Sequence, residues 1–133
     1  FLNDKNFFLD QSFSNLKSLE KAEILITDNS SIVFEFMLIF KRPIIYIDYK
    51  EKVHNTNREK MAVKTIDEEF KTVFGNILNV KNIKSLAELC EKLIEGNNES
   101  SELVDSFAKK YLSNLDHSAS FAANYLTNKS KSN

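Results

Sequence analysis

The sequence predicts an α/β fold in which short parallel strands alternate with helices. Ile24–Thr27 and Ile44–Ile47 are short apolar runs rich in β-branched residues, which is typical of buried strands. Between them, Ile32–Phe40 is a nearly continuous apolar run that predicts a buried helix. A strand, a helix and a strand in this order form a βαβ unit, which builds parallel sheets with right-handed crossovers. We therefore expect residues 22–48 to contribute two parallel, central strands of a Rossmann-like sheet.

The segment before the first strand is expected to hold one short strand and one helix. Phe7–Leu9 is apolar enough for a short strand. Leu16, Leu19 and Ala22 have helical spacing, and Ser14 stands where a helix cap is expected.

The segment after the second strand gives weaker signals. Residues 49–66 are charged and lack a clear period, so we expect a loop there. Glu68–Val73 is ambiguous between helix and strand. Phe74–Leu78 is interpreted as a turn that leads into a short strand.

The carboxyl-terminal half is predicted to be helical. A first amphipathic stripe, which ends at Gly96, consists of Leu86, Leu89, Cys90 and Leu93. The clearest stripe consists of Leu103, Val104, Phe107, Ala108, Tyr111, Leu112 and Leu115. A last helix is indicated by Phe121, Ala122, Tyr125 and Leu126. Because neither a repeat nor a dividing linker is evident, we expect residues 1–133 to form a single domain.

Composition excludes several classes of function. The chain has 18 Lys and Arg against 19 Asp and Glu, a net charge of −1, so no broad cationic surface for nucleic acid is expected. One cysteine and two histidines argue against a disulfide framework and a zinc cluster, and we expect no metal and no cofactor. Only two glycines are present, which removes Gly-rich phosphate loops. No apolar run is long enough to span a bilayer.

The strongest candidate site is the segment Asp28–Ser31, between the first predicted strand and the following helix. In open parallel sheets, ligands bind at the carboxyl edge of the strands. The start of a helix offers unpaired N–H groups, and the hydroxyls of Ser30 and Ser31 add donors for phosphate oxygens. The alternative is that one serine caps the helix while Asp28 closes the turn. Both roles can coexist.

Glu35 is the one charged residue in the predicted helix Ile32–Phe40. We expect such an apolar helix to be buried, where a carboxylate needs a partner. Glu35 lies about one helical turn from Ser31, so it faces the same end of the helix and could accept hydrogen bonds from the ribose hydroxyls of a ligand bound there. The alternative is a structural acid paired with Lys41, Arg42 or a backbone N–H group.

Other polar candidates have ordinary explanations. Lys41 and Arg42 could reach a phosphate, but basic residues at the end of a helix usually complement its dipole. Cys90 falls on an apolar stripe, which indicates a core thiol. His54 and His117 match no catalytic motif and are expected at the surface. In the loop after the second strand, basic residues alternate with acidic ones and are expected to be solvated; they are Lys50, Lys52, Arg58, Lys60 and Lys64.

These motifs carry a family resemblance. Residues 22–36 read AEILITDNSSIVFEF and residues 41–46 read KRPIIY. This order resembles the CDP-glycerol glycerophosphotransferase family of teichoic-acid and capsule polymerases and primases. The family pattern is an alanine followed by an acidic residue, an apolar strand, T-D-Y-S-S, an apolar helix with Asp or Glu, a basic residue, Pro and a second strand. A weaker likeness lies at residues 116–120. Asn29 replaces the family's usual aromatic residue, and His117 replaces its usual glycine.

The resemblance implies a GT-B fold, in which two Rossmann-like domains face each other and the carboxyl-terminal one holds the nucleotide donor. It implies that Ser30 and Ser31 contact the donor phosphates and that Asp28 shapes the loop. It also implies donor-binding roles for Glu35, through the ribose or by anchoring the helix, and for Ser120.

The resemblance further implies a metal-independent transferase that moves glycerol phosphate, or a related unit, from a CDP-activated donor. The acceptor would be a lipid-linked or polysaccharide chain, and the enzyme would be cytoplasmic with peripheral membrane association. The family's base histidine belongs to an upstream domain. Because Phe1 is not a Met, we expect this chain to be the carboxyl-terminal part of a longer protein. Since it would supply one side of the cleft and no base, we expect it to be inactive by itself.

Two other functions compete with this interpretation. A flavodoxin-like phosphoacceptor domain would explain why Asp28 and Asp48 both end strands, but the required acidic pair and lysine are not evident. A non-catalytic helical interaction module built on residues 83–127 would leave the Asp28–Ser31 loop unexplained.

Overall fold

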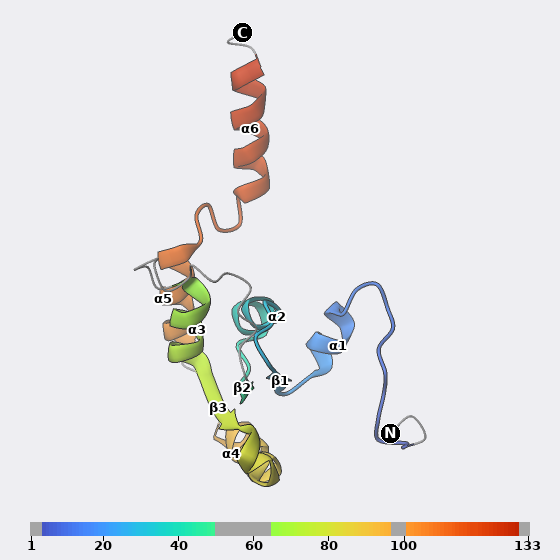
Figure 1. The fold of residues 1–133 in the computed structure, drawn as a ribbon. Coiled ribbons are helices and arrows are strands. Elements are labelled where there is room, and N and C mark those ends of the chain that lie inside the picture. Colours follow the sequence, from blue (N-terminus) through green and yellow to red (C-terminus); the bar gives the residue numbers. More distant parts are fainter. Residues whose placement is uncertain (1–3, 50–64, 97–100, 131–133) are drawn as a thin grey trace, which may run out of the picture. The chain divides into compact units, whose positions relative to one another are not determined.

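The computed structural model describes residues 4–49, 65–96 and 101–130 (Figure 1). The chain divides into two compact units, Phe1–Glu99 and Ser100–Asn133. The first unit holds the sheet and the candidate loop, and the second holds two helices.

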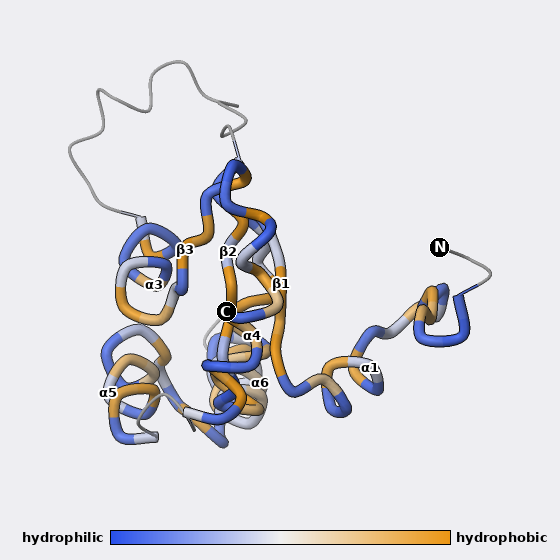
Figure 2. Tube along the Cα trace, turned by 90° about the horizontal axis from the view of Figure 1, so that it is seen from below, coloured by the Kyte–Doolittle hydropathy of each residue, from blue (hydrophilic) through white to orange (hydrophobic). Residues whose placement is uncertain are grey.

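Three parallel strands form the sheet of the first unit. They are β1 (Leu25–Thr27), β2 (Ile44–Asp48) and β3 (Gly75–Asn79), in the order β1-β2-β3. Leu25 pairs with Ile44, and Ile44 pairs with Gly75. The predicted parallel pairing of the first two strands is confirmed, and their apolar character is visible in Figure 2. β2 is central as expected, whereas β1 has a neighbour on one side only among the described strands.

The helices that connect the strands build the core. The predicted helix after β1 forms as α2 (Ile32–Glu35), which continues as a π-helix over Phe36–Phe40. The connection from β2 to β3 contains α3 (Ile66–Phe74). The rings of Phe34 and Phe70 lie 4.5 Å apart, so α2 and α3 pack against each other. In the described part of this unit, the largest fully buried side chains are Phe36, Met37, Ile44, Ile45, Phe70 and Phe74.

A capping box starts α3. The Thr65 side chain accepts a hydrogen bond from the backbone N–H of Glu68, and the Glu68 carboxylate accepts one from the Thr65 N–H. This reciprocal pair satisfies two N–H groups that a helix start otherwise leaves unpaired. It resolves the ambiguous segment as helix and places Phe74 in the last turn, with Gly75 opening β3.

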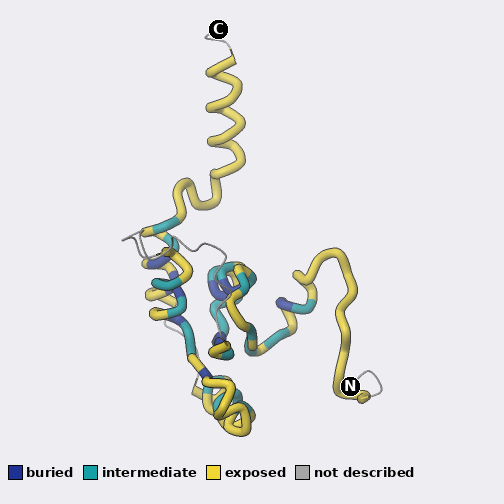
Figure 3. Tube along the Cα trace, viewed as in Figure 1, coloured by how far each residue is buried: buried dark blue, intermediate teal, exposed yellow. Residues whose placement is uncertain are grey.

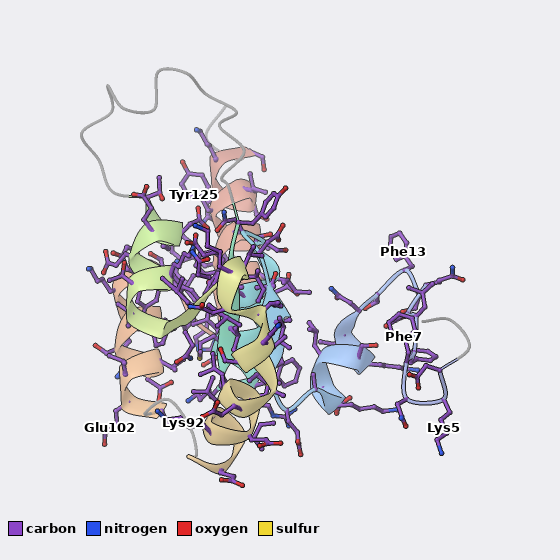
Figure 4. The ribbon with its side chains drawn as sticks, turned by 60° about the horizontal axis from the view of Figure 1, so that its bottom comes forward. Lys5, Phe7, Phe13, Lys92, Glu102 and Tyr125 are labelled. Atoms are coloured by element: carbon purple, nitrogen blue, oxygen red, sulfur yellow. The ribbon has the colours of Figure 1, made fainter. Side chains whose placement is uncertain are left out.

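The segment before β1 differs from its prediction. Phe7–Leu9 is not a strand: it makes no ladder pairing and its side chains are exposed. The predicted helix is present as α1 (Leu16–Lys21), with Leu19 buried. Its cap residue is Asn15, although the Ser14 hydroxyl does accept a long hydrogen bond from the Leu16 N–H. Figure 4 shows Phe13 projecting away from the backbone of this stretch.

The remaining helices of the first unit follow β3. A 3-10 helix, η3 (Val80–Ser85), leads into α4 (Leu86–Glu95), which ends at Gly96 as predicted. The four residues of its predicted stripe are all half-buried, Cys90 among them.

The second unit contains α5 (Ser101–Tyr111) and α6 (Ser118–Ser130). Val104 and Phe107 of the predicted stripe are buried, while Leu112 and Leu115 lie beyond the end of α5 and are exposed. The last helix forms as predicted, and it is exposed along its whole length (Figure 3). In the described parts of the chain, no helix is both long and apolar enough to cross a membrane.

Candidate functional site

The loop Asp28–Ser31 follows β1 directly and leads into α2. Since the three strands are parallel, their carboxyl ends share one edge of the sheet. Asp48 and Asn79, the last residues of β2 and β3, pair with each other at that edge. The sequence therefore placed the candidate loop correctly, on the side of the sheet where open α/β folds bind ligands.

Neither serine of the loop is a strong helix cap. The Ser30 hydroxyl accepts only a 3.5 Å hydrogen bond from the Ile32 N–H, and the Ser31 side chain makes no capping bond. Ser31 is exposed, while Ser30 is half-buried. The helix starts instead through the backbone, where the Phe34 N–H donates to the Ser31 carbonyl at 3.1 Å. The Ser31 hydroxyl is thus free to serve a ligand.

Glu35 lies in the predicted helix, but its exposure differs from the prediction. The sequence predicts a helix that is buried on all sides, whereas Glu35 is exposed to solvent. Val33, Phe36 and Met37 are buried, and Ile39 is 59% exposed, so this helix has a solvent-facing side. The need for a buried partner therefore disappears. Glu35 still follows Ser31 by one turn of α2, and its carboxylate is open to solvent.

Lys71 of α3 is a residue of this site that sequence reasoning missed. Its Nζ lies 3.3 Å from the Asn29 Oδ1 and 5.4 Å from the ring centre of Tyr46. Because α3 leads into the start of β3, it runs back from the carboxyl edge toward the amino edge of the sheet. Helical side chains lean toward the start of their helix, so Lys71 reaches up to the candidate loop.

The ring of Tyr46, a buried residue, lies beside the Lys71 ammonium group. Tyr46 lies in the central strand with 3% of its surface exposed. Burial, together with the negative charge of Asp67, raises the pKa of Tyr46 to about 12. The phenol therefore stays neutral at physiological pH, and its ring offers a π face to the Lys71 ammonium.

Arg42 has a structural role at the opposite edge of the sheet. Its Nη1 donates hydrogen bonds of 2.7 Å to the carbonyl oxygens of Glu20 and Ala22. These residues precede β1, and Arg42 itself precedes β2, so the whole group lies at the amino edge. The alternative that Arg42 binds a phosphate at the Asp28–Ser31 loop is therefore wrong.

The other sequence candidates fall in different places. His117 is exposed, as expected, and its carbonyl accepts a hydrogen bond from the Ser120 hydroxyl at 2.9 Å. Both residues belong to the second unit, so the donor role of Ser120 stays a prediction. His54 and the basic residues at 50–64 lie outside the described residues. Among the residues that are described, no three side chains of metal-ligating type come together.

Comparison with known proteins supports the resemblance noted in the sequence. A sequence model of the family described as CDP-glycerol:poly(glycerophosphate) glycerophosphotransferase matches residues 3–122. Neither the curated proteins nor the solved structures contain a significant match. Nothing in the comparisons favours the phosphoacceptor domain or the helical module. Because the match covers most of the 133 residues, from the N-terminal stretch into α6, the chain belongs to the CDP-glycerol:poly(glycerophosphate) glycerophosphotransferase family.

Proposed function

We propose that this chain forms the donor-binding part of a glycerophosphotransferase of GT-B type, and that a CDP-activated donor binds at the Asp28–Ser31 loop. The observation that carries the proposal is the exposed Ser31 hydroxyl, which makes no capping hydrogen bond and lies at the carboxyl edge of a parallel sheet. The family match supports a transferase, and it includes this loop.

The loop suits a diphosphate for three physical reasons. The hydroxyls of Ser30 and Ser31 can donate to phosphate oxygens. The start of α2 and its π-helical continuation presents N–H groups and the positive end of a helix dipole. The two serine hydroxyls also have little internal competition, since Ser30 accepts one long hydrogen bond from the Ile32 N–H and Ser31 makes no capping bond. Asp28 then shapes the turn.

Glu35 is placed for the sugar rather than for the phosphates. One turn into the helix from Ser31, its exposed carboxylate can accept hydrogen bonds from ribose hydroxyls. A carboxylate next to the diphosphate itself would repel it. We therefore assign phosphate binding to the serines and ribose binding to Glu35.

Transfer requires an acceptor hydroxyl in line with the reacting phosphorus and a base within reach of its proton. We propose that a lipid-linked or polysaccharide acceptor and the base histidine come from outside the residues described here. Donor-side stabilisation of the leaving phosphate charge by N–H and O–H groups is the contribution of this part. Peripheral association with the inner face of the cell membrane is part of the same proposal.

The test is a double substitution, Ser30→Ala with Ser31→Ala, in the full-length protein. We expect the affinity for CDP-glycerol to fall by about 1–3 kcal/mol, the range for losing hydrogen bonds to a charged group. The free energy of unfolding should change by less than about 0.5 kcal/mol, because neither side chain is a strong cap.

Isothermal titration calorimetry and urea unfolding measure the two quantities. Ser106→Ala, an exposed serine in the middle of α5, is the matched control and should leave both unchanged. Unaltered CDP-glycerol affinity in the double variant would remove the loop from the donor site. A loss of stability near 1 kcal/mol without a loss of affinity would restore the capping explanation.

A further inference from the structure

We infer that Lys71 is a donor-binding residue whose ammonium group pairs with the diphosphate of the nucleotide donor, and this inference rests on the proposed function. It concerns a residue of α3, 40 positions beyond Ser31 in the chain, that no sequence motif marked. The geometry that carries it is the contact between Lys71, Asn29 and Tyr46.

The Lys71 ammonium lies beside the loop and keeps N–H donors that can bind a ligand. An ammonium has three N–H donors. One donates to the neutral amide oxygen of Asn29 at 3.3 Å, and the Tyr46 ring lies 5.4 Å away. Within the described ranges the structure gives Lys71 no carboxylate partner. Its positive charge is therefore not paired with a carboxylate within the described residues and can interact with an anionic ligand.

The position of Lys71 is fixed from two sides. Tyr46 is buried in the central strand, and its ring centre lies 5.4 Å from the Lys71 Nζ. Asn29 immediately precedes Ser30, so a cation bound to the Asn29 side chain lies at the same loop as the serines that we assign to the phosphates. A held cation loses less conformational entropy when the donor binds, which strengthens its contribution.

Two carboxylates at this edge of the sheet make a nearby cation favourable for binding a diphosphate. Asp48 is the last residue of β2 and Asp28 directly follows β1, and both are exposed carboxylates. They oppose the approach of a diphosphate. Arg42 cannot compensate, because it is bonded to backbone carbonyls at the other edge. Of the residues described in this unit, Lys71 is the cation that the structure places in hydrogen-bonding contact with the loop.

The experiment compares Lys71→Met, Lys71→Gln and Lys71→Arg in the full-length protein. Lys71→Gln removes the charge but can still donate to Asn29, whereas Lys71→Arg keeps the charge. Lys17→Met, an exposed lysine of α1 that precedes the amino edge of β1, is the matched control. Calorimetric titrations use CDP-glycerol and cytidine, each at low and high NaCl, and thermal unfolding confirms that each variant folds.

We expect both neutral variants to bind CDP-glycerol about 10- to 100-fold more weakly, the loss that follows when an ionic hydrogen bond is removed. Their affinity should also depend less on NaCl, because a charge pair is screened by salt. Cytidine, which lacks phosphate, should bind as it does to the unsubstituted protein. Lys71→Arg should recover most of the affinity, and Lys17→Met should behave as the unsubstituted protein.

Three results would overturn the inference. Neutral variants that bind CDP-glycerol normally would show that Lys71 does not touch the donor. An equal loss for cytidine would show that Lys71 only holds the loop in place through Asn29. If the unsubstituted protein binds cytidine but gains nothing from the diphosphate, the proposed phosphate site fails as well. The first two results leave the proposed function intact, so the two failures can be told apart.

Discussion

Gly75 is the position where a single methyl group should disturb the fold most. It joins the last turn of α3 to the first residue of β3. A Cβ added there would lie 2.3 Å from the carbonyl oxygen of Lys71 and 2.9 Å from a ring carbon of Tyr46. The carbonyl cannot retreat freely, because it accepts the N–H of Gly75 itself. The ring cannot retreat either, because Tyr46 is buried in the central strand.

We expect Gly75→Ala to lower the free energy of unfolding by about 2–3 kcal/mol. Overpacking a well-filled site costs about 1–3 kcal/mol, and weakening the hydrogen bond at the helix end adds about 1 kcal/mol. The smaller entropy of an unfolded chain with alanine offsets about 0.4–1 kcal/mol of this loss. Urea unfolding followed by far-UV circular dichroism measures the difference.

The control is Gly96→Ala at the end of α4. This glycine has φ −71°, which alanine adopts readily, and it is exposed. Its added Cβ would meet one backbone oxygen of its own helix at 2.9 Å, in a place where the helix end can adjust. The control should change stability by less than about 1 kcal/mol. A Gly75→Ala protein as stable as the unsubstituted one would refute the close approach of α3 to β2.

Two further predictions concern Arg42 and Tyr46. Arg42→Met should lower the free energy of unfolding by about 2 kcal/mol in urea unfolding, because it removes two hydrogen bonds from a charged donor, while calorimetry should find CDP-glycerol affinity unchanged; a specific loss of affinity would contradict the structural role. Because the pKa of Tyr46 rises from 10.0 to about 12 on folding, its contribution to stability is complete below pH 10 and falls as pH rises from 10 to 12. Unfolding measured across this range should show that decline, and Tyr46→Phe should reduce it.

The fold around β1, α2 and β2 was predictable because its signals are local. Two β-branched runs flank an apolar run, and each run is bounded by residues that end an element. The segment 65–79 was harder, because α3 passes into β3 without a turn between Phe74 and Gly75. The capping box of Thr65 and Glu68 was the one available local sign of the helix start.

The candidate site was predictable only in part. Its serines could be found because a polar loop between a strand and a helix is a local pattern. The exposure of Glu35 could not be predicted, because hydropathy shows which residues are apolar but not which side of a helix the rest of the fold covers. The contact of Lys71 with Asn29 spans 42 residues, so it depends on how α3 packs and leaves no trace in either segment alone.

The direction of the chain separates the roles of the basic residues. In a parallel sheet every strand runs the same way, so residues that precede strands gather at one edge and residues that follow strands gather at the other. Arg42 precedes β2 and donates hydrogen bonds to carbonyls that precede β1, so it links the two chain segments that lead into neighbouring strands. Lys71 also precedes a strand, by four residues, yet its helix runs against the strands and its side chain leans back along that helix. A lysine on the last turns of a crossover helix can therefore contact a ligand at the carboxyl edge of the sheet. A basic residue in the short segment just before a strand instead stabilises the fold at the amino edge.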